Sequence, residues 1–285
     1  MKTCIYQICY SQETFENIPA GFLCLNHMKN ERPDWRELWP MRNFLKTNEL
    51  SEDVLYGFLS PKFSQKTLLN HSGVQDFLSS NYAGEDLVSF SPFWDLMALF
   101  KNVFEQGDFF HPGLSDTCQK LMSAYPLDLN LANCIMSSQN TIFCNYFLAN
   151  KKFWSHWLIL ADYLVATSEQ QNTELSIKLN APTSYGEQQL SMKVFVQERL
   201  ASLCLLAHPT FRCLNYSPFN IGPSTTPFNQ FFHEAVLSDA LKRAYVQTNQ
   251  TSYLDAFASL RNSVIQKLYG GSDGGGKVSG FSSPL

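Results

Sequence analysis

Two lysines, Lys62 and Lys66, follow a short apolar segment and could neutralise a phosphate group. The segment spans residues 54–59, reads Val-Leu-Tyr-Gly-Phe-Leu and is typical of a buried strand. Ligands of open α/β sheets bind outside the carboxyl ends of strands, so a loop at that place is suited to a diphosphate. The alternative is a pair of solvated surface lysines, and the spacing alone leaves both interpretations open.

A second candidate is the neighbouring pair Glu198 and Arg199, which stands in an apolar segment that predicts a helix over residues 192–207. On that helix both charges point along apolar stripes. A charge in apolar surroundings must be paired, or its pKa shifts. The pair is therefore either a structural ion pair or a carboxylate base beside an arginine that faces phosphate.

Two single residues complete the candidates. Asn145 stands among aromatic residues in a predicted strand over residues 141–148, and its amide needs hydrogen-bond partners, either backbone groups or sugar hydroxyls. His111 precedes Pro-Gly and a predicted helix over residues 114–124, and a helix N-terminus favours anions. A lone histidine in such a turn is more often structural.

Several standard motifs are missing from the sequence, which has no Walker A, GxGxxG, GxSxG or HExxH pattern. It also lacks an Asp-x-Asp pair, and the nearest isolated candidates are Asp86 and Asp95. The eight cysteines show no CxxC spacing, which favours buried reduced thiols over a zinc site. The identity of any metal is left open.

Composition narrows the class of protein. The chain has 285 residues, of which 45% are hydrophobic, and a formal net charge of −4. No basic stripe is visible, which argues against a duplex nucleic-acid partner. The N-terminus has no long apolar stretch typical of a signal peptide, and no apolar run approaches the length of a membrane span. We therefore expect a cytoplasmic protein without a transmembrane segment.

The order of the predicted elements favours an α/β fold with a mostly parallel sheet flanked by helices. We expect a single domain over residues 1–269, with a helical C-terminal part at about 228–268. The Gly/Ser-rich stretch 270–285 is predicted to be a disordered tail. Predicted strands cover residues 4–10, 54–59, 86–90, 141–148 and 211–216. Predicted helices include 33–47 with a break at Pro40, 93–105, 192–207, 230–249 and 252–268, whereas 168–191 is predicted to be a long loop.

Taken together, these motifs resemble a group of bacterial proteins described as uncharacterised or as glycosyltransferases. More distantly, the layout is similar to GT-A enzymes that carry a Tyr-Val-Gly-Leu-x-His-Tyr-Arg-Arg strand and loop, an Asn-Met-Phe-Ile-Met strand and a late Gly-Phe-x-x-Glu-Arg-Leu helix. The corresponding stretches are residues 55–66, 145–149 and 195–200. Lysines 62 and 66 stand where that family has adjacent arginines, and Glu-Arg-Leu at 198–200 is the best match.

The resemblance implies a GT-A-like fold with added C-terminal helices and the transfer of a hexosyl or related sugar from a nucleotide sugar, assisted by Mn or Mg in many such enzymes. It assigns Lys62 and Lys66 to the donor diphosphate and Asn145 to a sugar hydroxyl, and His111 joins the donor-binding set. Glu198 is then a base or orienting group, and Arg199 its partner or a phosphate ligand.

The acceptor implied is a glycan or a lipid-linked sugar in surface-polysaccharide biosynthesis, which would place the enzyme peripherally at the inner membrane face. Two other classes stay open. One is a non-catalytic relative that binds a sugar nucleotide or a partner protein, and the missing Asp-x-Asp favours it. The other is a hydrolase with an unrecognised site.

Overall fold

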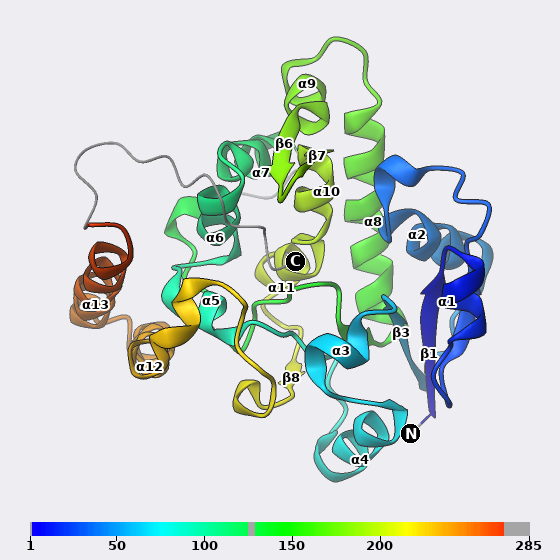
Figure 1. Ribbon diagram of the computed structural model, residues 1–285, viewed down its shortest axis with the longest axis horizontal. Coiled ribbons are helices and arrows are strands. Elements are labelled where there is room, and N and C mark those ends of the chain that lie inside the picture. Colours follow the sequence, from blue (N-terminus) through cyan, green and yellow to red (C-terminus); the bar gives the residue numbers. More distant parts are fainter. Residues whose placement is uncertain (1, 125–128, 271–285) are drawn as a thin grey trace.

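A six-stranded sheet forms the centre of the computed structural model, which describes residues 2–124 and 129–270 (Figure 1). The strand order is β2-β1-β3-β5-β4-β8. Strands β1, β2 and β3 are parallel, β4 is parallel to β8, and β5 is antiparallel to both of its neighbours. The strands are β1 (Lys2–Cys9), β2 (Leu23–Asn26), β3 (Val54–Leu59), β4 (Leu87–Ser89), β5 (Phe147–Ala149) and β8 (Cys213–Asn215). The predicted α/β class with a mostly parallel sheet is confirmed.

Strand β3 is buried at all six positions, as its continuous apolar run predicts. Alternate side chains enter different apolar clusters: Tyr56 and Phe58 belong to one, Leu55 and Leu59 to the other. Gly57 is required here, because a Cβ at this position would lie 2.1 Å from a methyl carbon of Leu148 on β5. Apolar layers therefore cover both faces of the sheet.

Helices supply those layers. On one face, α8 (Lys151–Ser168) packs against β3, and the Trp154 indole donates a hydrogen bond of 3.0 Å to the Tyr56 carbonyl. The cluster on the other face includes residues of α3 (Phe63–Thr67) and α4 (His71–Asn81). The remaining helices of the first part of the chain are α1 (Gln12–Glu16), α2 (Leu38–Thr47), α5 (Trp94–Leu99), α6 (Val103–Phe110) and α7 (Leu114–Ala124), with short 3-10 turns η1 (Pro33–Trp35) and η2 (Leu131–Asn133).

The C-terminal helices α12 (Phe232–Thr248) and α13 (Thr251–Tyr269) form a pair, of which α12 packs against α5. Figure 1 shows this pair at the far end of the molecule from β1. The 3-10 turns η3 (Pro218–Asn220) and η4 (Pro227–Gln230) precede it. Both helices were expected from the sequence. The predicted tail lies outside the described residues except for Gly270.

Two predicted elements are wrong because local backbone geometry interrupts them. The helix expected over residues 93–105 is divided into α5 and α6, and Asn102 caps α6 by accepting hydrogen bonds from the amides of Phe104 and Glu105. The strand expected over 141–148 is reduced to β5. Cys144 and Asn145 have φ angles of 58° and 54°, which no β-strand contains.

The loop expected over residues 168–191 is also wrong. It contains α9 (Glu174–Asn180) and the antiparallel hairpin of β6 (Pro182–Tyr185) and β7 (Gln188–Ser191). Gly186 supplies a positive φ of 59° in the hairpin turn. The polar composition conceals these strands because they are only partly buried.

Two helix breaks lie at unexpected places. The break expected at Pro40 occurs at Arg36 instead, and Pro40 sits in the first turn of α2, where its missing amide hydrogen has no helical partner to lose. The helix expected over 192–207 divides at Glu198 and Arg199 into α10 (Met192–Gln197) and α11 (Leu200–Ala207). Both breaks place charged residues at a bend of the chain.

Across the two described ranges, the structure has no helix whose length and apolar character would suit a membrane crossing.

Candidate ligand-binding site

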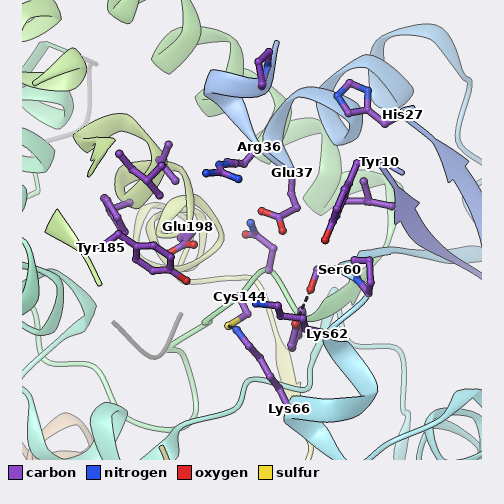
Figure 2. A pocket seen from close by; sticks show the side chains of 18 of the residues that line it. Tyr10, His27, Arg36, Glu37, Ser60, Lys62, Lys66, Cys144, Tyr185 and Glu198 are labelled. Atoms are coloured by element: carbon purple, nitrogen blue, oxygen red, sulfur yellow. Dashed lines mark hydrogen bonds between the residues drawn. The ribbon is translucent and has the colours of Figure 1, made fainter. Parts of the chain in front are cut away.

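A cavity of about 520 Å³ opens at the carboxyl edge of the sheet (Figure 2). The chain leaves β1 for β2 on one side and returns to β3 on the other side of β1, which makes this edge a topological switch point. Tyr10 after β1, His27 after β2 and Lys62 after β3 all line the cavity. Ligands of open α/β sheets bind at this kind of place.

Strand β5 brings a further group of residues to the same edge because it runs in the opposite direction. Its amino end, rather than its carboxyl end, meets the cavity, and Cys144 and Asn145 stand there with left-handed backbones. Asn145 is 5% exposed, and its Oδ1 atom has no hydrogen-bond partner among the residues that the structure describes. Strained backbone and an unsatisfied buried acceptor are both typical of functional sites.

The opposite walls come from η1 and from the region of the hairpin and α10. Arg36 and Glu37 follow η1, Tyr185 ends β6, and Glu198 follows α10. Figure 2 shows the Glu37 carboxylate pointing into the cavity, between Arg36 and Tyr10, with Glu198 on a facing wall. Segments that are distant in the sequence therefore converge on one space.

Three positive charges line this cavity: Arg36, Lys62 and Lys66. Within residues 2–124 and 129–270, none of the three forms an ion pair with a carboxylate. The Lys66 ammonium donates to the Cys144 sulfur at 3.5 Å. Cations without an ion-pair partner that converge on a cavity attract an anionic ligand.

The surroundings of Glu198 shift the pKa of its carboxyl group strongly. Burial raises its pKa, the Arg199 charge opposes that rise and the Glu37 charge adds to it, which brings the pKa to about 7. The Glu198 side chain keeps 17% of its surface exposed, toward the cavity. A carboxyl group with a pKa near neutrality is suited to accept a proton from a ligand.

Arg199 lies behind Glu198 and is fully buried. Its guanidinium donates to Glu198 Oε2 at 3.2 Å, to the Phe195 carbonyl at 2.7 Å and to Gln106 Oε1 at 3.1 Å. Gly107 provides the space, since a Cβ there would lie 2.9 Å from Arg199 Nη2. Arg199 therefore braces Glu198 from the core.

The structure brings together four of the six residues predicted from the sequence: Lys62, Lys66, Asn145 and Glu198 line one cavity. Arg199 and His111 do not belong to its lining. His111 is 1% exposed, and its ring stacks on Phe195 at 3.6 Å. Burial, followed by the nearby Arg199 charge, lowers the His111 pKa to about 3, so the imidazole is neutral.

The lining residues that sequence reasoning missed include Tyr10, Arg36, Glu37 and Tyr185. Tyr10 ends the first predicted strand, and this position at the carboxyl end of a strand was a usable signal. Arg36 and Glu37 fall within a stretch that carries the family resemblance, but a continuous helix was expected there. Tyr185 was hidden in a segment predicted to be a loop.

The carboxylates of the cavity do not fit the pattern of a Mg or Mn site. Glu37 and Glu198 stand on separate walls, and Glu198 is already paired with Arg199. The described ranges contain no group of three or more His, Cys, Asp or Glu side chains placed to hold a metal ion. Such ions are usually held by clustered oxygen ligands, so we assign no step to a metal.

Comparison with protein-family models, with curated proteins and with solved structures found no match for this chain. The resemblance to GT-A enzymes therefore stays a prediction. The functional conclusion rests on the cavity, which combines a switch-point location, unpaired cations and a carboxylate that titrates near neutrality.

Proposed function

We propose that this protein is a glycosyltransferase that binds a nucleotide sugar in the switch-point cavity. It transfers the sugar to a hydroxyl group of a glycan or lipid-linked acceptor during surface-polysaccharide assembly. The observation that carries the proposal is the convergence of unpaired Lys62 and Lys66 with Glu198 on a single cavity. An inverting transfer requires cations that stabilise the anionic leaving group and a group that accepts the proton of the acceptor hydroxyl.

The donor would bind through its diphosphate and its sugar. Lys62 and Lys66 neutralise the diphosphate at the end of β3, where the carboxyl edge of the sheet is open. The amide of Asn145, which lines the cavity, binds a sugar hydroxyl. The positive φ of Asn145 holds this amide at the edge of the cavity, which reduces the conformational cost of binding.

The transfer step follows from these roles. The acceptor hydroxyl oxygen forms a bond to the anomeric carbon, while the bond from that carbon to the diphosphate oxygen breaks. The electron pair of the broken bond leaves with the nucleoside diphosphate, whose charge the two lysines stabilise. The hydroxyl proton passes to the Glu198 carboxylate, which Arg199 holds in place.

A thermal-shift screen of the whole chain tests this proposal first. Nucleoside diphosphates, nucleoside monophosphates and nucleotide sugars are compared with and without manganese. We expect diphosphates and nucleotide sugars to raise the melting temperature more than monophosphates, because a ligand that binds the native state stabilises it by mass action. Release of nucleoside diphosphate from the best donor is then measured with glycan and lipid-linked acceptors.

The outcomes separate the functional classes. No stabilisation by any of these compounds would overturn the proposal. Stabilisation by a nucleotide sugar without hydrolysis or transfer would instead identify a non-catalytic sugar-nucleotide-binding protein. A response to manganese would show that the bound diphosphate supplies metal ligands that residues 2–124 and 129–270 do not cluster.

A further inference from the structure

Arg36 has an unusual backbone for a residue with a side chain. Its φ and ψ angles are 46° and −133°, a conformation that glycine adopts readily and other residues avoid. The residue ends η1 and precedes α2, so the bend directs its side chain toward the cavity. Non-glycine residues remain in such conformations when the surrounding structure fixes them, and such residues cluster at binding sites.

A buried clamp fixes the segment before Arg36. Trp35 has no exposed surface, and the Lys193 ammonium lies 4.6 Å from the centre of its ring. The same ammonium donates to Asp34 Oδ2 at 2.8 Å and to Asn180 Oδ1 at 2.9 Å. Lys193 is 5% exposed, so water competes little with these bonds. The clamp therefore holds the strained bend in place.

The Arg36 guanidinium itself is available to a ligand. Arg36 is exposed and lines the cavity, and in the part of the chain that the structure describes its guanidinium makes neither an ion pair nor a hydrogen bond. Figure 2 shows it on the side of the cavity away from Lys66, with the Glu37 carboxylate between them. Glu198 lies on a further wall, also between these positive groups.

This arrangement argues against a single anion that contacts all three cations. An anion spread from Lys66 to Arg36 would have to pass the Glu37 and Glu198 carboxylates, which repel it. Two separate anionic groups, one on each side, avoid this repulsion. The carboxylates then face the space between the two groups, where an acceptor hydroxyl would meet the donor sugar.

We propose that Arg36 forms a second anion-binding subsite, separate from Lys62 and Lys66, that takes a phosphate or carboxylate group of the acceptor. The assignment to the acceptor rests on the proposed transferase function. A planar guanidinium binds either group through paired hydrogen bonds. The anionic group of the acceptor is either the phosphate of a lipid-linked sugar or the carboxylate of an acidic glycan. Titration with inorganic phosphate and with glucuronate distinguishes these two sources.

Calorimetric titration of the whole chain tests the subsite. The protein is first saturated with the nucleoside diphosphate that stabilises it most, and is then titrated with inorganic phosphate and, separately, with glucuronate. We expect one further equivalent of anion to bind. Arg36→Ala should weaken this second event at least about tenfold and change nucleoside diphosphate affinity less than about twofold. The anion that binds more tightly indicates the source.

Two variants serve as matched controls. Arg243→Ala removes an exposed arginine of α12 outside the cavity and should leave both binding events unchanged. The double variant Lys62→Ala with Lys66→Ala should weaken the nucleoside diphosphate event and retain the phosphate or glucuronate event. If Arg36→Ala and the double variant weaken the same event equally, the cavity has one anion site and the inference is wrong.

The inference can fail separately from the proposed function. If no nucleoside diphosphate binds, the proposed function fails, but the titration with phosphate alone still decides the role of Arg36. Loss of phosphate binding in Arg36→Ala, with retention in the double lysine variant, supports the subsite. Equal phosphate binding by Arg36→Ala and the wild type contradicts it.

Thermal stability gives an independent measurement. Arg36→Gly should raise the melting temperature, because glycine relieves the backbone strain, and should remove the second binding event. Leu68→Gly is the control: Leu68 also has a positive φ of 62°, is 76% exposed and does not line the cavity. It should raise the melting temperature with both binding events intact. A lower melting temperature for Arg36→Gly would show that Arg36 is structural.

Discussion

The positive charges of the core and those of the cavity differ in how completely they are paired. Lys193, Arg199 and Lys242 are each 5% exposed or less, and each donates at least two hydrogen bonds to oxygen atoms. Lys242, for example, bonds the carbonyls of Met97 and Phe100, and burial lowers its pKa to about 7. These hydrogen bonds are needed because a buried charge without polar partners is strongly destabilising.

The positive charges of the cavity, in contrast, form no ion pairs among the described residues. Arg36, Lys62 and Lys66 line an open space without a carboxylate partner in the described ranges, although the cavity contains two carboxylates. A fold selected only for stability would be expected to pair such groups. The core charges hold the walls in position, whereas under the proposed function the cavity charges bind the ligand.

The largest expected effect concerns Glu198, which lines the cavity and also accepts a hydrogen bond from the core residue Arg199. Glu198→Gln should lower the rate of sugar transfer by about 100-fold or more, because a positioned base contributes roughly 10²–10⁴-fold. Initial rates at pH 8 measure the effect, and circular dichroism checks the fold. The control Glu49→Gln removes an exposed carboxylate elsewhere and should leave the rate unchanged. An unchanged rate in Glu198→Gln would exclude this residue as the base.

The next effect concerns Arg199, the buried positive charge behind Glu198. Arg199→Ala should lower the free energy of unfolding by about 3–5 kcal/mol, since it leaves Glu198 and Gln106 without their partner. Urea denaturation measures this change, with Arg243→Ala as the exposed arginine control. If Arg199→Ala instead kept its stability and lost ligand binding, Arg199 would be a ligand-binding residue and not a core charge that stabilises the fold.

A smaller effect is expected for the cavity lysines. Lys62→Ala combined with Lys66→Ala should weaken nucleoside diphosphate binding by about tenfold or more, because a hydrogen bond to a charged group contributes roughly 1.5–3 kcal/mol. The melting temperature without ligand should not fall, since no ion pair is lost. The control Lys29→Ala with Arg243→Ala removes the same charge from exposed positions outside the cavity. Equal affinity in the two double variants would move the diphosphate site elsewhere.

The smallest effect is a change in pH dependence. The transfer rate should rise with pH through about 7, because Glu198 must lose its proton to act as a base. Glu37→Gln removes a negative charge that raises the Glu198 pKa, so the midpoint of the rate profile should move to lower pH. A midpoint that stays in place or moves upward would show that Glu37 does not act on Glu198.

Stability should respond to the same group with a defined sign. The folded-state pKa of Glu198, about 7, lies above its ordinary value of 4.5, so the protonated carboxyl favours the folded state. Its contribution is fully present below pH 4.5 and is lost as the pH rises through 7. Glu198→Gln should therefore raise the melting temperature at pH 8 more than at pH 5.

The parts of the site that depend on local patterns could be predicted from the sequence. The continuous apolar run of β3 marks a buried strand, and Lys62 and Lys66 follow it directly. Glu198 could be recognised because a charge in an apolar helical segment is unusual. Their convergence with Asn145 depends on the reversed direction of β5, which periodicity does not encode.

The parts that depend on distant contacts could not be predicted. The bend at Arg36 is held by the bond between Lys193 and Asp34, which are 159 residues apart in the chain. The division between α10 and α11 at Glu198 and Arg199 accompanies the contacts of Arg199 with Gln106. Local propensity favoured a continuous helix at both places, and tertiary contacts override such propensity.

The position of β5 between β3 and β4 has a consequence for how the chain folds. β3 pairs with β5 although the helices α3 to α7 lie between them in the sequence. During synthesis, β1, β2 and β3 can associate early, but β3 then has an open hydrogen-bonding edge along an apolar strand until residues 147–149 emerge. Such an edge favours aggregation, and pairing over a long sequence separation is slow. We expect the completion of the central sheet, and with it the cavity, to be a late and vulnerable step of biogenesis.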